Sequence, residues 1–106
     1  MTLHQALLTT ALLCIGAGAA LAQQPGVVVQ GSSDVRSGGL PAARQNDSTT
    51  TPGTGVEEGS PDVIINGRPA ARLGDRTNCG VIVRGSSNVF INGRPMARTG
   101  DNTSGC

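Results

Sequence analysis

The chain has 106 residues, with eight basic and seven acidic side chains and a formal net charge of +1. This near-neutral balance offers no electrostatic basis for binding nucleic acid or a membrane surface. Phe90 is the only aromatic residue. A domain this small and this poor in large apolar side chains usually needs a crosslink, a metal or a partner for stability.

The N-terminal segment differs in composition from the rest of the chain. Residues 6–22 form an apolar stretch that ends in Ala-Leu-Ala. The small residues at positions −3 and −1 of a possible cut after Ala22 suit signal peptidase, so residues 1–22 are predicted to be a signal peptide. The alternatives are an uncleaved apolar anchor, or a misplaced start codon with the chain beginning near Val27. Cleavage would deliver the protein to the periplasm or the exterior; without cleavage it would assemble in the cytoplasm before any secretion.

Residues 23–106 are predicted to form one domain made of three copies of one short unit. The copies lie near residues 27–47, 55–75 and 81–101. Each copy has β-branched runs punctuated by Gly, Ser, Asn and Pro, and no helical periodicity. A unit this short cannot bury a core alone, so the three copies must share one. The expected fold is therefore all-β, with short hairpins closed in pseudo-threefold symmetry.

A turn signal follows the strand of each copy. Residues 66–67 and 92–93 read Asn-Gly directly after β-branched runs at 63–65 and 89–91. Asn-Gly in this setting indicates a type I′ hairpin turn, because that turn needs positive φ at both central residues. The Gly-Gly pair in the first copy meets the same demand. The polar insert that separates the first two copies is predicted to be a loop.

Each return strand contains a proline, which is followed by Ala-Ala in the first two copies and by Met-Ala in the third. Proline cannot donate to a β-ladder, so these strands are predicted to be edges or to be broken there. The small pairs at 42–43, 70–71 and 96–97 admit two interpretations. In the first, the three backbones converge on a crowded axis; in the second, each pair belongs to a short edge strand with nothing to bury.

An arginine and an aspartate three residues apart close every copy. Their triplication favours a structural role over a catalytic one, through local Arg–Asp pairing or through aspartate capping of its own turn. The residues of this repeated motif are Pro41, Arg44, Asp47, Pro69, Arg72, Asp75, Pro95, Arg98 and Asp101.

No feature of the sequence supports catalysis. The only histidine is His4, inside the predicted leader, and no serine stands in a nucleophile-elbow context. The carboxylates belong to the repeated motif. We therefore expect no catalytic residue, no cofactor and no small-molecule substrate.

Three P-x-A-R blocks, three Gly-Ser corners and two I-N-G-R-P hairpins occur in fixed order across residues 27–106. This pattern resembles the PAAR-repeat proteins. The resemblance implies a small β cone that caps, as a monomer, the blunt end of a trimeric VgrG-like β-helical spike in a type VI secretion or related contractile injection system. The alternative is an exported stand-alone PAAR-like β domain that serves as an envelope or periplasmic binding or structural module.

The chain departs from this family in three ways. Members usually open at the first PAAR block and end with a lone Gly-Ser strand, whereas residues 27–39 supply that strand at the N-terminus here, as in a circular permutation. A signal peptide is not expected of a spike component. Members also hold zinc with three histidines and one cysteine, and no histidine remains in the corresponding loops. Only Cys79 and Cys106 are candidate ligands, and two thiolates do not complete a tetrahedral site, so no zinc is expected.

The resemblance places Cys79 and Cys106 in loops that meet near the apex of the cone. Removing the leader leaves these two cysteines, an even number. We therefore predict a Cys79–Cys106 disulfide where relatives keep a metal, formed in an oxidising compartment. The alternative is a pair of free thiols in a cytoplasmic protein.

Overall fold

The structure is a computed structural model that describes residues 24–106, so the predicted leader lies outside the described residues. Within that range there is no helix with the length and apolar character needed to cross a bilayer. The regular elements are short antiparallel strands, which confirms the predicted all-β class. They are β1 (Gly26–Val27), β2 (Arg36–Ser37), β3 (Leu40–Pro41), β4 (Ile64–Ile65), β5 (Arg68–Pro69), β6 (Phe90–Ile91), β7 (Arg94–Pro95) and β8 (Asn102–Thr103).

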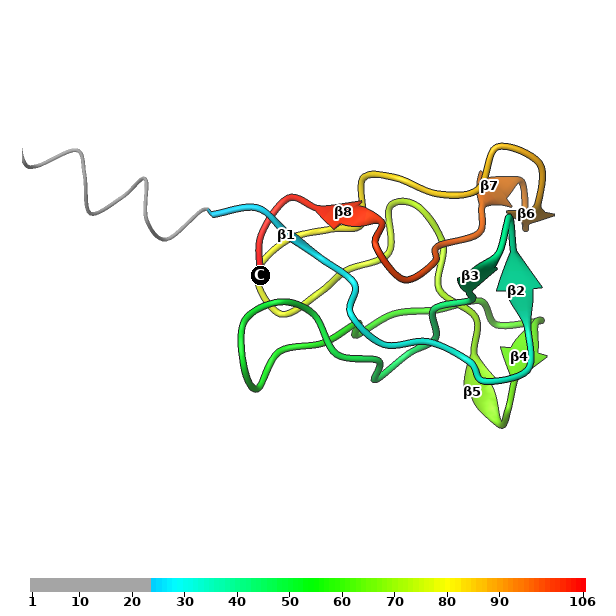
Figure 1. The fold of residues 1–106 in the computed structure, drawn as a ribbon, viewed down its shortest axis with the longest axis horizontal. Helices are drawn as coiled ribbons and strands as arrows, with labels where there is room; N and C mark the ends of the chain where they lie inside the picture. Colours follow the sequence, from blue (N-terminus) through cyan, green and yellow to red (C-terminus); the bar gives the residue numbers. More distant parts are fainter. Residues whose placement is uncertain (1–23) are drawn as a thin grey trace, which may run out of the picture.

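Three hairpins, one from each copy, lie together at one end of the domain, here called the hairpin end (Figure 1). They are β2–β3, β4–β5 and β6–β7. Asn66 and Asn92 have φ of 53° and 54°, and the glycines that follow them also have positive φ. The predicted positive-φ turns are therefore confirmed. The strands begin one residue later than the β-branched runs suggested.

The Gly-Ser corner of each copy packs closely against the proline of the same copy. In the second copy a Cβ on Gly59 would lie 2.7 Å from the Cβ of Pro69, so only glycine fits. The Ser60 hydroxyl accepts hydrogen bonds from the backbone N–H groups of Asp62 and Val63 at 3.0 and 2.9 Å. The corner thus turns the chain into the hairpin, and the first and third copies repeat both features.

Three alanines form a closed ring of hydrogen bonds where the copies meet. The Ala43 N–H donates to the Ala97 carbonyl, Ala71 donates to Ala43, and Ala97 donates to Ala71, each at 2.9 Å. All three side chains are fully buried. The structure therefore decides between the two interpretations of the small pairs: the backbones converge on a crowded axis, where a larger side chain would collide.

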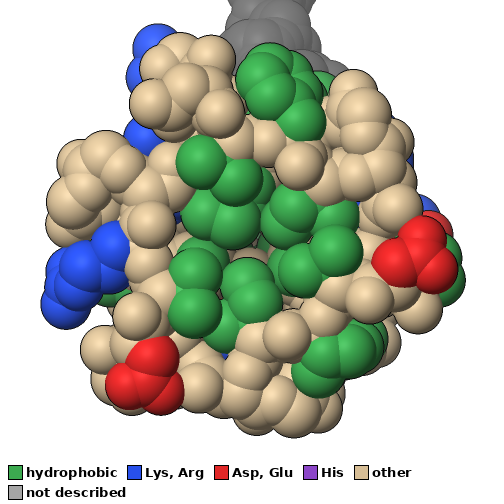
Figure 2. Space-filling model, turned by 90° about the vertical axis from the view of Figure 1, so that its right-hand side faces the viewer, with side chains coloured by type: hydrophobic (Ala, Val, Ile, Leu, Met, Phe, Trp, Pro, Cys, Tyr) green, Lys and Arg blue, Asp and Glu red, His purple; other side chains and the backbone are tan. Residues whose placement is uncertain are grey.

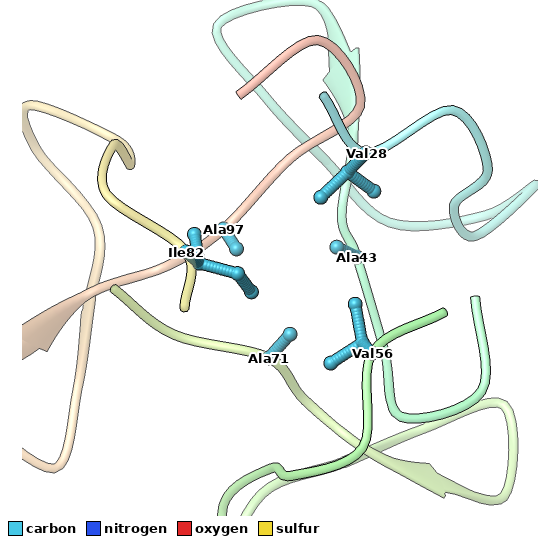
Figure 3. Packing of buried hydrophobic residues seen from close by; sticks show 6 residues of the cluster. All are labelled: Val28, Ala43, Val56, Ala71, Ile82 and Ala97. Carbon is cyan, nitrogen blue, oxygen red and sulfur yellow. The ribbon is translucent and has the colours of Figure 1, made fainter. Parts of the chain in front are cut away.

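The core consists of two thin layers stacked along this axis. In the first layer one large side chain from each copy packs against the alanine ring, and the six side chains point toward a common centre (Figure 3). The second layer contains Ile65 and Ile91, with Ser37 at the equivalent position of the first copy. Met96 stands where the other copies have alanine, so it adds volume to the layer that Ser37 depletes. The first layer is Val28, Ala43, Val56, Ala71, Ile82 and Ala97.

The start of each copy is hydrogen-bonded to the end of the preceding copy, and the start of the first copy is bonded in the same way to the end of the third. The Val56 N–H donates to the Asp47 carbonyl at 2.9 Å, and Ile82 makes the same bond to Asp75. Val28 makes this bond to the carbonyl of Asp101 in the last copy, at 3.0 Å. Strand β1 accordingly pairs with β8, and the beginning of the described chain lies beside its last residue, at the end opposite the hairpins (Figure 1).

Candidate functional site

The hairpin end presents a central apolar patch, with further apolar groups and the charged side chains toward its periphery (Figure 2). Val35, Val63 and Val89 occupy equivalent positions in the three copies and are 38%, 37% and 37% exposed. These matched values show that the surface repeats with the symmetry of the fold. We call this surface the hairpin face; its large hydrophobic side chains are Val35, Leu40, Val63, Ile64, Val89 and Phe90.

The largest exposed hydrophobic side chains stand at one position of the hairpin. Ile64 is 55% exposed and Phe90 is 57% exposed, each as the first residue of its strand. The first copy has Arg36 there. Gathered apolar side chains of this kind on a small domain mark an interaction surface. At this position of the hairpin, the second and third copies therefore carry an apolar side chain and the first copy carries a cationic one.

The Arg–Asp motif both forms an ion pair and caps its own turn. In the second copy the Asp75 carboxylate accepts the Arg72 backbone N–H at 2.8 Å, and Arg72 Nε and Nη2 at 2.9 Å each. The Asp75 side chain is fully buried. The hydrogen bond to Asp75 raises the pKa of Arg72 above its usual value, although burial opposes the shift. The first and third copies repeat this geometry, and the pKa of each arginine is raised for the same reason.

An asparagine side chain joins neighbouring copies at two of the three junctions. The Asn92 carbonyl oxygen accepts the Ser60 hydroxyl at 2.6 Å and Arg72 Nη1 at 2.9 Å. Its amide nitrogen donates to Asp62 at 2.8 Å. Asn92 thus ties the third hairpin to the corner and arginine of the second copy. Asn66 ties the second hairpin to the first copy through Ser32, Arg44 and Asp34.

An arginine–aspartate ion pair joins the same neighbouring copies as each asparagine. Arg94 of the third hairpin donates to the Asp75 carboxylate at 3.0 Å, and Arg68 of the second hairpin donates to Asp47. Sequence reasoning treated the asparagines as turn residues and paired each aspartate only with its local arginine. The sequence did contain a signal for these links, because I-N-G-R-P occurs in the second and third copies, whereas the first copy has Gly38 and Leu40 in place of Asn and Arg.

The opposite end of the domain is held by Cys79 and Cys106, which the structure joins as a disulfide with Cα atoms 5.7 Å apart. We call it the disulfide end. The Gly105 carbonyl accepts the Thr77 hydroxyl at 3.2 Å. A Cβ on Gly26 would lie 2.3 Å from the Cys106 carbonyl carbon, so the first strand packs tightly on the last residue.

The described residues do not fit the zinc site of the family. No group of three or more His, Cys, Asp or Glu side chains within residues 24–106 is placed to hold a metal ion. Both cysteines are joined to each other, and a disulfide sulfur is not the thiolate that zinc binds. The same part of the chain contains no pocket.

The chain matches the PAAR motif over residues 18–81 and again over residues 49–106. No curated protein matches it. The two overlapping matches span the three copies, the alanine ring and both ends of the domain. The chain therefore belongs to the PAAR motif family.

Proposed function

We propose that this protein is a structural spike tip, with its hairpin face seated on the end of a trimeric VgrG-like β-helical spike of a type VI secretion or related contractile injection system. The observation that carries the proposal is the pseudo-threefold apolar face, with three equivalent valines almost equally exposed. A trimer offers three equivalent sites around one axis. A single chain can match them only if it repeats itself three times around its own axis.

The fold supports this role mechanically. The alanine ring joins all three copies, and the ion pairs Arg68–Asp47 and Arg94–Asp75 link neighbouring copies, so a load on one hairpin is shared by all three. The disulfide end points away from the proposed partner (Figure 1). An apolar interface centre with a polar rim is typical of specific protein contacts. Nothing in this role requires catalysis.

The test is complex formation between the full chain and a VgrG-like protein from the same genome. Ile64→Glu and Phe90→Glu place a charge at the two most exposed apolar positions of the face. Each variant should abolish co-elution, because a buried unpaired carboxylate is costly. Val83→Glu is the matched control: Val83 is 45% exposed and lies outside the hairpins. Full binding by either face variant, at unchanged melting temperature, would contradict the proposal.

A second candidate function is an exported stand-alone module of the envelope or periplasm. The disulfide favours it, because such bonds persist in oxidising compartments. The intact mass of the protein from its host separates the candidates. Cleavage after Ala22 with an oxidised cysteine pair, in a periplasmic protein that does not co-purify with a spike, supports export. An uncleaved chain recovered with the spike supports the tip.

A further inference from the structure

The junction between the third and first copies lacks the links that hold the other two. Gly38 stands where the other hairpins carry Asn66 and Asn92, and Leu40 stands where they carry arginine. Among the described residues, two hydrogen bonds that involve side chains connect this hairpin to the third copy: the hydroxyls of Ser37 and Ser86 lie 2.8 Å apart, and the Thr99 hydroxyl donates to the Pro41 carbonyl at 3.0 Å. Two of the three groups that would have bound the missing asparagine, Ser86 and Arg98, are nevertheless still present.

Arg98 is the clearest of these groups. Its Nε and Nη2 bind Asp101, as in the other copies, but its Nη1 has no hydrogen-bond partner within residues 24–106. Its side chain is 19% exposed, against 11% for Arg44 and 8% for Arg72, whose Nη1 atoms bind asparagine. A Cβ on Gly38 would lie 3.4 Å from Arg98 Nη1. The free edge of the guanidinium therefore faces the place where a side chain is missing.

The charge around this turn is more positive than at the other junctions. Asn88 replaces the aspartate found at the same place in the first two copies, and it accepts the Ser86 hydroxyl. Arg36 Nη1 donates to the Gly39 carbonyl at 3.2 Å, so a second guanidinium reaches the same turn. Arg36 forms no ion pair within the described part of the chain. We call Arg36, Arg98 and the turn at 38–39 the two-arginine site.

We propose that the two-arginine site binds a carboxylate side chain of the protein that docks on the hairpin face. The inference rests on the proposed docking function and adds to it the chemistry of one partner residue. A carboxylate supplies the acceptor that Asn66 and Asn92 supply internally, and its charge complements the guanidinium groups. A threefold partner would present three such acids, of which one binds here. The other two would remain hydrated at the rim, because Asn66 and Asn92 already fill their sites.

Gly38→Asn is the discriminating variant. Gly38 has φ of 61°, close to the 53° and 54° of Asn66 and Asn92, so asparagine fits the backbone there. The new side chain should bind Arg98 internally. It should therefore raise the melting temperature and, at the same time, block the site. If the missing asparagine affects only stability and the site binds nothing, Gly38→Asn should raise the melting temperature and leave binding unchanged.

The first readout uses acetate as the carboxylate probe and needs no partner. Acetate is added to the 15N-labelled full chain at constant ionic strength, and the side-chain N–H signals of the arginines are followed by NMR. The Arg98 and Arg36 signals should shift several-fold more than those of Arg84, which forms no ion pair among the described residues. Gly38→Asn should remove the excess at Arg98. Equal shifts at all three arginines would mean an adventitious ion only and would overturn the proposal.

The second readout is affinity for the spike protein. Gly38→Asn and Arg36→Gln should each weaken binding about tenfold, as expected for the loss of one charged hydrogen bond. Arg84→Gln, which removes the same charge elsewhere, should not. Wild-type affinity in both site variants would overturn the proposal. If the wild type binds no spike protein, the docking function fails, while the acetate titration still decides whether the site takes a carboxylate.

Discussion

Each buried aspartate of the PAAR blocks accepts several hydrogen bonds from arginine. Asp75 receives three hydrogen bonds from Arg72 and one from Arg94, and its side chain is fully buried. Because the pKa of Arg72 is raised in the folded state, the arginine's contribution to stability is present at any pH below its ordinary pKa. It is lost only in strong alkali, as the pH rises through the raised value.

Asp75→Asn should lower the free energy of unfolding by about 3 kcal/mol, because it leaves two arginines without their buried counter-charge. Chemical denaturation of the full chain measures this loss. Asp62→Asn is the control: Asp62 is exposed, the third copy already carries Asn88 at that position, and asparagine keeps an oxygen that can accept the Asn92 amide. The control should cost less than about 0.5 kcal/mol, as for most surface substitutions. Equal losses in the two variants would show that burial of Asp75 is not the cause.

The loops at the disulfide end depend on the Cys79–Cys106 bond more than the hairpins do. The bond encloses a separation of 27 residues and fixes the carbonyl of Cys106, which accepts the Thr51 N–H at 3.2 Å. The hairpins lie at the other end and are held by their own turns and junction links. The two ends should therefore respond differently to reduction.

Replacing both cysteines with serine should lower the free energy of unfolding by about 3 kcal/mol on the chain-entropy account. Binding through the hairpin face should be unchanged if the protein remains folded. Thermal unfolding with and without reductant gives the first quantity, and the spike-binding assay gives the second. Thiol counting on the unfolded mature protein, without reductant, should find no reactive cysteine. Two reactive thiols would refute the disulfide.

The complete domain is a ring closed without a peptide bond between its last and first copies. Val28 occupies the place in the first copy that Val56 occupies in the second, and both are buried. They differ in connectivity, because Val28 directly follows strand β1 near the start of the domain and contacts the third copy only through hydrogen bonds and packing. If the ring is fully closed, Val28 and Val56 should contribute equally to stability despite this difference in connectivity.

Val28→Ala and Val56→Ala should destabilise the protein equally, by about 2 kcal/mol each, since each leaves a cavity in the same core layer. Equilibrium denaturation of the two variants tests this directly. Hydrogen exchange at the Val28 amide should also be as slow as at Val56. A much smaller loss for Val28→Ala would mean that the first strand frays and that the ring is open at the junction of the third and first copies.

The internal repeat and the local chemistry of residues 23–106 were sufficient to predict the all-β class, three hairpins and the family. Asn-Gly and Gly-Gly turns depend on backbone preferences of one or two residues, which act the same way in any context. The cysteine pairing was proposed from the resemblance, and the structure joins the same two residues. Its oxidation in the cell stays a prediction, as do the leader and the partner.

The roles of Asn66, Asn92, Arg68 and Arg94 emerged only in the tertiary structure, because their partners lie 19 to 34 residues away in another copy. Likewise, only the hydrogen-bonded alanine ring showed that the three backbones converge on a crowded axis instead of forming separate edge strands. The open edge of Arg98 was the least predictable feature, since the sequence shows only that Gly38 replaces an asparagine. Turn residues act within their own segment, so sequence reveals them. Contacts between copies depend on how the copies are placed around the axis, and only the folded ring specifies that placement.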